Sequence, residues 1–341
     1  MPTPIGLTRL NQLQLSADKL YVSVGPGNRW EDVYNYLEPY GLVALGGRVG
    51  NVGVPGLLLG GEISFYSNQY GFSANNVIAY EVSPMHNLIE FFSDAYRTQQ
   101  ILKSTGQVVL ASGQIITATA TEYSDLFWAL KGGGNSFGIV TRFDLSTCSS
   151  PSISAGIIEV AETEEDIFLN AVANFGLYGS LDSKAAVIPS VFMLSSYNVT
   201  VNTSALFYDG TTCDQPALQN LSSIPATTNS FGPTTLAAYT ASTDALIGPS
   251  TRQEFQAFSS LATLAALQII YPIFNSMVRS DIWDVAGLRA SVTFQPVTRN
   301  FIQQGINKGG NPQGVNVTYA PYFCNPPSFP PTSMAYFTII S

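Results

Sequence analysis

The order of apolar and polar residues predicts a strand followed by a helix near the start of the chain. Residues 19–24 alternate between the two kinds, as in a half-buried strand, and a glycine-proline-glycine turn ends the alternation. Asn28 lies three residues before Glu31, a spacing typical of the capping box that begins a helix. The helix would bury one face, because apolar residues recur at i, i+3, i+4 and i+7: Trp30, Val33, Tyr34 and Leu37.

Short patterns of the same kinds continue to about residue 147. They predict a strand at 75–81, a β-hairpin at 108–119, a short helix at 124–131 capped by Ser124, and a strand at 137–145. Beyond residue 147 the glycine content falls and strands rich in serine and threonine appear. We therefore place a domain boundary near residue 147.

The second part of the chain alternates between strand and helix patterns. Strands are predicted at 185–194 and 199–208, and helices at 162–175 and 253–270. An apolar run at 261–274 is too short to span a bilayer and predicts a buried helix. Together these patterns indicate an α+β fold in which the second lobe is an antiparallel sheet covered by helices.

Between the first helix and the next strand lies a glycine-rich stretch, residues 46–61, around which the chain is organised. Seven of its sixteen residues are glycine, and the gaps are filled mostly by apolar residues rather than the serine of flexible linkers. The apolar residues predict that the segment is buried. A buried glycine-rich backbone with free N–H groups suits a phosphate-bearing cofactor. The alternative is that the glycines only form tight turns between packed strands.

Charge narrows the range of partners. Only 11% of the 341 residues are charged, and the formal net charge is −9. This balance argues against nucleic acid or an anionic membrane surface as a partner. His86, the single histidine, has no cysteine, aspartate or histidine at ligand spacing, so we expect no metal site.

Cysteines and glycosylation sequons bear on the compartment. Cys148, Cys213 and Cys324 are widely spaced, form no metal pattern, and allow one disulfide or none. The first residues of the sequence have no basic start and no apolar h-region of a signal peptide. Low charge and four N-x-S/T sequons nevertheless favour a secreted glycoprotein; the sequons are at Asn198, Asn202, Asn220 and Asn316.

A second glycine cluster, residues 132–138, has a superficial likeness to a dinucleotide fingerprint. A Rossmann fingerprint follows a strand and opens a helix, whereas these glycines follow a predicted helix and open a predicted strand. We therefore do not predict a Rossmann fold.

One ordered set of motifs has a more specific likeness. It consists of residues 53–61 (Gly-Val-Pro-Gly-Leu-Leu-Leu-Gly-Gly), Tyr70-Gly71, Asn76-Val77, residues 109–113 (Val-Leu-Ala-Ser-Gly), residues 125–134 (Asp-Leu-Phe-Trp-Ala-Leu-Lys-Gly-Gly-Gly) and residues 138–141 (Gly-Ile-Val-Thr). This set, over about residues 5–147, resembles the FAD-linked oxidoreductases of the vanillyl-alcohol-oxidase type. It is most similar to fungal members near berberine bridge enzyme and the oligosaccharide oxidases. Residues 294–296 and 308–312 resemble the family's substrate lobe more loosely.

The resemblance implies a PCMH-type FAD-binding domain at residues 1–147 and a substrate-binding lobe at residues 148–341. It implies that FAD lies extended in the first lobe, that a small-molecule substrate loses a hydride to the flavin, and that dioxygen usually reoxidises it. Carried over residue by residue, it assigns the flavin and pyrophosphate to Gly53, Val54, Gly56, Gly60 and Gly61. It assigns the cofactor's flank to Asn76 and Val77, and the adenosine end to Gly138, Ile139 and Val140.

Several positions depart from the family pattern. Pro55-Gly56 stands where Gly-Gly is usual, Glu62 stands where a third glycine is usual, and Val49 stands where some relatives have a flavin-linked cysteine. The family's Arg-Ser-Gly-Gly-His segment and its C-terminal catalytic Tyr and Asn have no match here. We therefore expect a chain that is truncated at both ends, with its catalytic residues unknown.

Residues 82–107 interrupt what the family would have as one strand, so we interpret them as an insertion. Val82-Ser83 can be encoded by GTNAGT, a common splice donor, and Gln107 by CAG, a common acceptor. Removing the segment keeps the frame and restores the motif. A retained intron is our hypothesis, and sequencing of the mature transcript tests it.

The sequence thus predicts an FAD-dependent oxidase of an alcohol, a sugar or a secondary metabolite. Two alternatives stay open. The chain could be a non-catalytic, truncated product unable to hold FAD, or it could be a flavin dehydrogenase or cyclase that does not use dioxygen.

Overall fold

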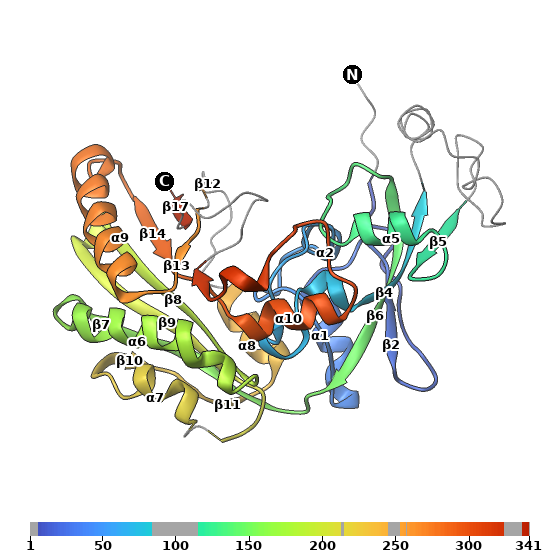
Figure 1. Cartoon of the computed structure of the whole chain (residues 1–341), viewed down its shortest axis with the longest axis horizontal. Coiled ribbons are helices and arrows are strands. Elements are labelled where there is room, and N and C mark those ends of the chain that lie inside the picture. Colours follow the sequence, from blue (N-terminus) through green and yellow to red (C-terminus); the bar gives the residue numbers. More distant parts are fainter. Residues whose placement is uncertain are drawn as a thin grey trace. The chain divides into compact units, whose positions relative to one another are not determined.

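The computed structural model describes residues 6–83, 115–212, 215–244, 253–256, 258–323 and 336–340. The chain forms two compact units, coloured by sequence in Figure 1 and described separately here. The first unit is made of Met1–Ser64, Phe72–Pro151 and Gly305–Gln313. The second is made of Phe65–Gly71, Ser152–Gln304 and Gly314–Ser341. Each unit therefore takes in a short segment from the other part of the sequence.

The first unit is built on a six-stranded sheet with the order β1-β2-β6-β4-β5, in which β3 pairs with β6. Every pairing is antiparallel. The strands are β1 (Leu13–Leu15), β2 (Tyr21–Val24), β3 (Leu42–Ala44), β4 (Val77–Ser83), β5 (Ile116–Thr119) and β6 (Ile139–Ser149). The helices of this unit are α1 (Trp30–Leu37), η1 (Glu38–Tyr40), α2 (Val54–Leu59), η2 (Ser73–Asn76) and α5 (Ser124–Leu130).

An aromatic group fixes the middle of this sheet. The buried ring of Tyr80 on β4 meets Phe127 of α5 and Phe143 of β6 edge-on, each with ring centroids 5.7 Å apart. Such edge-to-face pairs add to the burial of apolar area. They join α5 to the two central strands.

Helix α1 has the predicted buried face but a different N-cap residue. Arg29 is the N-cap, and its N–H donates to Oδ2 of Asp32 at 2.8 Å. The predicted cap, Asn28, instead donates its amide to the carbonyl of Gly25 at 2.9 Å. The prediction of an Asn28 cap was wrong because the preceding turn uses this side chain as a donor. Ser124 likewise begins α5 without capping it, since Tyr123 is the N-cap residue.

The second unit contains an eight-stranded antiparallel sheet with the order β10-β7-β9-β8-β14-β17-β12, in which β11 pairs with β7. Its strands are β7 (Ile153–Ala161), β8 (Ala185–Leu194), β9 (Val199–Tyr208), β10 (Ala226–Asn229), β11 (Gly232–Thr234), β12 (Gln253–Gln256), β14 (Arg289–Thr293) and β17 (Tyr336–Ile340). A small three-stranded sheet is formed by β13 (Ser260–Leu261), β16 (Tyr322–Phe323) and β15 (Pro296–Val297).

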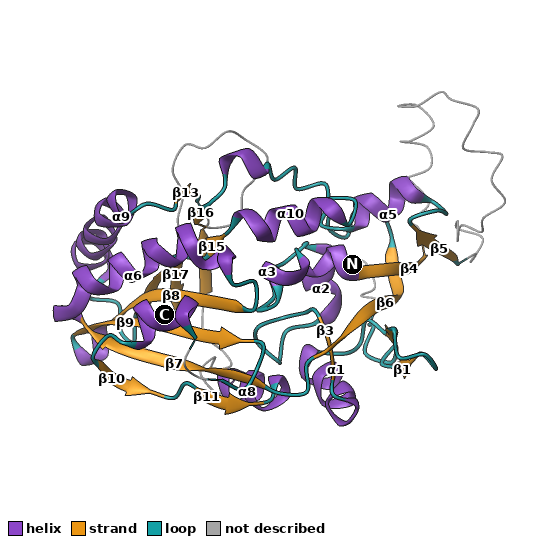
Figure 2. Cartoon of the chain, turned by 60° about the horizontal axis from the view of Figure 1, so that its bottom comes forward, coloured by secondary structure: helices purple, strands orange, loops and turns teal. Residues whose placement is uncertain are grey.

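Helices cover one face of the large sheet, as Figure 2 shows. The α-helices that begin in this unit are α3 (Ser67–Tyr70), α6 (Glu165–Tyr178), α7 (Pro216–Ser222), α8 (Leu236–Asp244), α9 (Leu264–Met277) and α10 (Arg299–Asn307). Shorter helical turns are η4 (Glu162–Glu164), η5 (Gly179–Leu181), η6 (Ser195–Tyr197), η7 (Val278–Ile282) and η8 (Val317–Tyr319).

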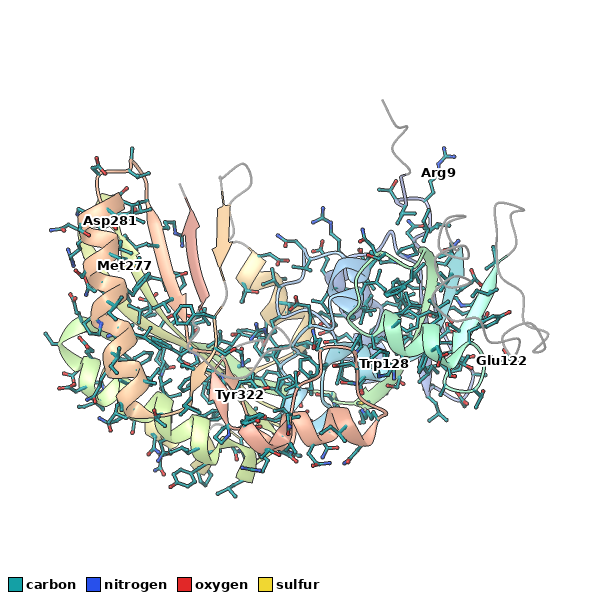
Figure 3. All side chains as sticks on the ribbon, turned by 45° about the horizontal axis from the view of Figure 1, so that its top comes forward. Arg9, Glu122, Trp128, Met277, Asp281 and Tyr322 are labelled. Carbon is teal, nitrogen blue, oxygen red and sulfur yellow. The ribbon has the colours of Figure 1, made fainter. Side chains whose placement is uncertain are left out.

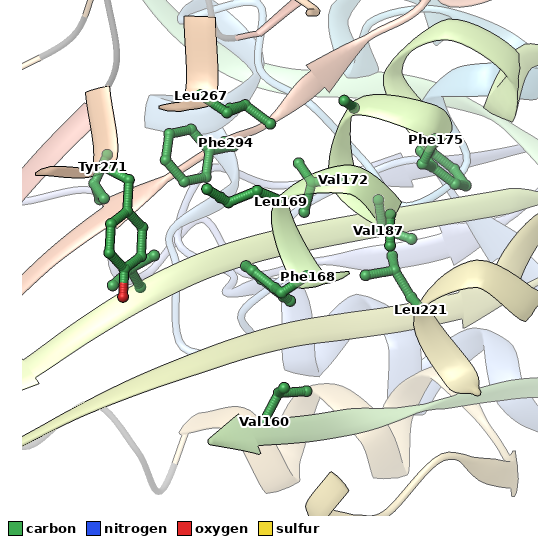
Figure 4. Packing of buried hydrophobic residues seen from close by; sticks show 14 of the residues in the cluster. Val160, Phe168, Leu169, Val172, Phe175, Val187, Leu221, Leu267, Tyr271 and Phe294 are labelled. Carbon is green, nitrogen blue, oxygen red and sulfur yellow. The ribbon is translucent and has the colours of Figure 1, made fainter. Parts of the chain in front are cut away.

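The core of this unit lies between the sheet and helices α6, α7 and α9. Phe168 and Leu169 of α6, Leu221 of α7 and Leu267 of α9 are buried together with strand residues such as Val187 (Figure 4). The opposite face carries Phe207, which stacks on Phe65 with ring centroids 4.9 Å apart. The predicted antiparallel sheet covered by helices is therefore confirmed, and the strands at 185–194 and 199–208 match β8 and β9.

The predicted helix at 253–270 was wrong at its start. Residues Gln253–Gln256 form strand β12, which pairs with β17, and α9 begins only at Leu264 after the N-cap Thr263. The threonine hydroxyl accepts from the N–H of Ala266 at 3.3 Å, which fixes this start.

Helix α9 is also not buried on all sides. Leu267, Tyr271 and Phe274 face the core, whereas Ile269 and Met277 are half exposed or more; Met277 is labelled in Figure 3. Among the residues that the structure describes, no helix is both long and apolar enough to cross a membrane.

Some sequence predictions lie outside the described residues. These are most of the proposed insertion (84–107), including His86, the first strand of the hairpin near residue 110, and Cys213 and Cys324. The second strand of that hairpin is β5, and it pairs antiparallel with β4 from Ala79–Thr119 to Val82–Ile116. Among the described residues, Cys148 is in no disulfide.

Candidate functional site

Some glycines of the 46–61 stretch are required by packing, because a Cβ would clash with a neighbouring side chain, and others are not. A Cβ on Gly46 would lie 2.0 Å from the indole ring of Trp30, and one on Gly47 would lie 2.8 Å from it. The indole is fully buried, and the hydroxyl of Tyr34 donates to the carbonyl of Gly47 at 2.7 Å. Gly46 and Gly47 thus let α1 pack against this stretch, as the alternative explanation of the glycines requires.

Gly53 and Gly56 have open space where a Cβ would lie. Gly53 is the N-cap of α2, and the nearest atom to a Cβ placed on it would be 4.0 Å away, in the ring of Pro55. A Cβ on Gly56 would meet nothing within 4 Å, and both glycines are exposed. Packing therefore does not require glycine at these two positions. A backbone left open in this way lets a bulky ligand approach closely.

The expectation that the whole stretch is buried was wrong for this reason. The side chains of Val54, Leu58 and Leu59 are buried, but the backbone at Gly53, Gly56 and Gly60 is exposed. A short amphipathic helix, α2, accounts for both facts. Pro55 lies in its first turn, where an N–H would have no partner within the helix.

The remaining glycine-loop positions already use their N–H groups inside the chain. Val54 donates to the carbonyl of Asn28 at 3.1 Å, Gly60 to Gly56 at 3.1 Å, and Gly61 to Leu58 at 3.2 Å. The N–H donors of these three residues are therefore already engaged, unlike the open faces at Gly53 and Gly56.

Gly60 and Gly61 also hold the loop at Gly305–Gln313. Nε2 of Gln313 donates to the carbonyl of Gly60 at 2.9 Å, and a Cβ on Gly61 would lie only 2.6 Å from that nitrogen. Gly61 has a φ of +83°, and Gly132 packs beside it, with a virtual Cβ 3.4 Å from the Cα of Gly61. Three glycine-rich segments thus meet at the end of α2.

Asn76 and Val77 lie where η2 ends and β4 begins. Asn76 is buried, donates to the carbonyl of Phe72 at 2.9 Å, and its Oδ1 accepts from the ammonium group of Lys308. Val77 is buried and pairs with Leu145 of β6. Helix α2 contacts η2, so Asn76 belongs to the same region as the glycine stretch.

Gly138, Ile139 and Val140 lie at the other end of the same strand pair. Val140 is buried and stands opposite Val82, whereas Val77 pairs near the far end of β6. Five residues along β4 correspond to roughly 17 Å at the usual rise of a strand. The structure therefore separates the residues predicted for the adenosine end from those predicted beside the flavin and pyrophosphate.

Two lysines that the sequence analysis did not predict as site residues, Lys131 and Lys308, lie in this region. Lys131 is 4% exposed, and its Nζ lies 3.4 Å from the carbonyl oxygen of Lys308 and 4.3 Å from the ring centroid of Phe127. Burial and the nearby charge of Lys308 lower the pKa of Lys131 to about 8. Burial also lowers the pKa of Lys308, although Cys148 opposes this shift. The position of Lys131 directly before three glycines is the sequence feature that could have identified it as a site residue.

The loop that carries Lys308 is held at a second point. Nδ2 of Asn75 donates to the carbonyl of Gly310 at 2.9 Å, and Gly309 and Gly310 adopt positive φ values of +89° and +68°. Positive φ favours glycine, so the paired glycines suit this turn. Within the described ranges, no group of three or more metal-ligating side chains is present.

Comparison with known proteins relates the first part of the chain to FAD-binding proteins. Residues 3–84 match the family model described as an FAD binding domain. The chain is 35% identical over 322 residues to the FAD-dependent monooxygenase prx3 of Penicillium roqueforti, covering 90% of this chain and 57% of that protein. The chain thus spans little more than half the length of this curated relative.

Solved structures agree in fold. The 6-hydroxy-D-nicotine oxidase of Arthrobacter nicotinovorans superposes with a TM-score of 0.66 at 17% identity, covering 98% of this chain and 64% of that one. The xylooligosaccharide oxidase of Myceliophthora thermophila C1 gives 0.65 at 18% identity, covering 98% and 65%. At these identities the similarity establishes the fold alone. Residues 3–84 thus match an FAD binding domain, the chain is similar over most of its length to a fungal FAD-dependent monooxygenase, and its fold is that of these solved oxidases. These matches identify FAD as the cofactor.

Proposed function

We propose that this chain is part of an oxidase that removes a hydride from an alcohol, a sugar or a secondary metabolite. FAD supplies the hydride acceptor when it is bound, and dioxygen is the proposed final oxidant. The observation that carries the proposal is the open space beside Gly53 and Gly56, because packing in the described chain does not explain those glycines. Residues 1–147, most of which lie in the first unit, would form the FAD-binding domain. Residues 148–341, most of which lie in the second unit, would form the substrate lobe.

The predicted site residues take different parts in this proposal. The exposed backbone of Gly53 and Gly56 would contact the cofactor directly, and Val54, Gly60 and Gly61 would shape the same surface. Asn76 and Val77 would lie along the cofactor, and Gly138, Ile139 and Val140 would lie at its adenosine end. The spacing along β4 supports a cofactor bound in an extended form.

The sheet of the second unit supports a hydroxylated substrate. Paired residues on adjacent antiparallel strands share a face, so Glu159, Thr203, Ser190 and Thr293 form a polar row across β7, β9, β8 and β14. The neighbouring Val160 points to the helix-covered core, which places the row on the opposite face. The hydroxyls of Ser190 and Thr293 lie 2.8 Å apart. Apolar side chains flank the row: Ile157, Ala205 and Ile188.

A row of hydroxyls and a carboxylate between apolar side chains suits a substrate that has both hydroxyl groups and an apolar ring. The experiment is anaerobic mixing of the FAD-loaded protein with candidate sugars, benzylic alcohols and phenolic metabolites. An oxidase bleaches its flavin absorbance with a substrate and releases hydrogen peroxide when air is admitted. Bleaching without peroxide would favour the dehydrogenase or cyclase, and a protein that holds no FAD would favour the non-catalytic alternative.

We also propose that the protein is a secreted glycoprotein, but burial excludes one of its four sequons as a glycosylation site. Asn202 is 0% exposed and lies within β9, so a glycan at this position cannot fit the fold. Asn198, Asn220 and Asn316 are exposed. Expression through a fungal secretory pathway should add glycans only among these three, and glycosidase treatment followed by mass spectrometry of the peptides checks it. A glycan on Asn202 would contradict the burial.

A further inference from the structure

Two lysines, one buried and one half-buried, lie close together in the first unit. Lys131 follows directly after α5, and its Nζ approaches the backbone carbonyl of Lys308 at 3.4 Å. The side chain of Lys308 reaches Oδ1 of Asn76. The mutual repulsion of the two charges contributes to the lowered pKa of Lys131.

The contacts of the buried lysine are neutral. Its ammonium group meets a carbonyl oxygen and the face of the Phe127 ring, with the centroid 4.3 Å away. Lys131 takes no part in the ion pairs that Arg142 forms with Glu81 and Asp144. A buried cation without an anion is costly, so this arrangement favours the binding of a negatively charged group.

The position of the pair shows which anion fits. Gly132, the next residue after Lys131, packs against Gly61, and the N–H of Gly134 donates to the carbonyl of Leu59 at 2.9 Å. The lysine is therefore connected through its own backbone to the end of α2. Lys308 contacts the side chain of Asn76, where η2 ends and β4 begins. The two cations thus lie within the glycine-rich region proposed to hold FAD.

We propose that Lys131 and Lys308 bind the diphosphate of FAD. This inference rests on the proposed function, since it assumes that FAD occupies the glycine-rich region of the first unit. Two negative phosphates would match two ammonium groups that otherwise repel each other, and lysine acts on phosphate as a compact point charge. The clamp would supply the attraction that Glu62 and the missing N–H of Pro55 take away from the glycine loop.

The test compares FAD affinity by flavin fluorescence in the wild type and in Lys131→Met, Lys308→Met and Lys131→Arg. Lys184→Met, at an exposed lysine of the second unit, is the matched control. Loss of one charge-assisted contact should weaken FAD binding roughly tenfold to a hundredfold, whereas Lys131→Arg and the control should stay within about threefold. Thermal unfolding of each variant shows whether it is folded.

A second measurement needs no variant. Lysine acylation at pH 8 is followed by mass spectrometry, with and without inorganic pyrophosphate or FAD. Protection of the half-buried Lys308 by both ligands, with Lys184 labelled throughout, supports the clamp. If the wild type binds FAD but Lys308 is not protected and the methionine variants bind equally well, the inference is overturned and the proposed function stands. If the wild type binds no FAD, the proposed function falls and the inference falls with it.

Discussion

Replacing Gly56 with alanine should separate folding from cofactor binding. Gly56 lies inside α2, and a Cβ there meets nothing within 4 Å of the chain. Alanine is favoured over glycine within a helix by about 0.5–1 kcal/mol, so the variant should be slightly more stable than the wild type without FAD. If FAD covers this backbone, the methyl group must instead be accommodated against the ligand. Overpacking of this kind costs about 1–3 kcal/mol, which corresponds to a roughly fivefold to 150-fold weaker Kd.

The assay measures two quantities on the same protein. Urea unfolding gives the free energy of unfolding without ligand, and flavin fluorescence gives the Kd for FAD. Gly232→Ala is the control, because this glycine of β11 in the second unit also has open space around its virtual Cβ. The reasoning predicts weaker FAD binding for Gly56→Ala only. Unchanged FAD affinity in a folded Gly56→Ala protein would refute it, because the open face would then not be a cofactor surface.

Three further predictions concern the described interior. Because the pKa of Lys131 falls from 10.5 to about 8 on folding, the unfolded chain binds more protons between these values, and stability should rise with pH. The wild type should gain about 1 kcal/mol from pH 7 to pH 9 relative to Lys131→Met; in urea unfolding, a difference in free energy between the two proteins that is the same at both pH values would contradict this. Gly46→Ala should destabilise by ~3 kcal/mol or more, since its Cβ would lie 2.0 Å from the buried ring of Trp30; a thermal midpoint equal to that of the wild type would show that the ring can move. Asn68→Ala should lower the free energy of unfolding by about 2–4 kcal/mol, as measured by chemical unfolding. The side chain of Asn68 donates to the carbonyl of Ala185 on β8 at 2.7 Å and accepts from the hydroxyl of Thr298 at 2.7 Å. A loss below about 0.5 kcal/mol would contradict the prediction and mean that water replaces both bonds.

Periodicity predicted the elements whose burial is one-sided. Strands β8 and β9 have the expected bounds and helix α1 has the expected buried face, because their apolar residues repeat with a clear period. The start of α9 was misplaced because residues 253–256 carry no strong pattern, and their strand depends on pairing with β17, far away in the sequence. A short stretch of sequence carries no information about a pairing strand so far away in the chain.

Family motifs predicted the cofactor, but not the surroundings of each motif residue. The motif treats Gly53, Gly56, Gly60 and Gly61 as equivalent, whereas the fold gives open space to the first two and engages the N–H groups of the others. The approach of Lys131 to Lys308 joins segments 177 residues apart, so no spacing rule could find it. Contacts made by tertiary structure decide which motif residues are free to meet a ligand.

The sequence does not decide between an oxidase and the two alternatives to it. A dehydrogenase or cyclase would use the same FAD surface and the same hydroxyl-lined sheet face, and would differ only in reactivity toward dioxygen. A non-catalytic chain would lack the cofactor altogether. The central claim is therefore the binding of FAD by the glycine-rich face of the first unit.

Titration of FAD into the purified chain, followed by flavin fluorescence and by co-elution on gel filtration, tests that claim most directly. The account predicts saturable binding of one FAD per chain, weakened by Gly56→Ala and left unchanged by Gly232→Ala. Flavin that remains free at every protein concentration, with a folded chain confirmed by circular dichroism, would contradict it.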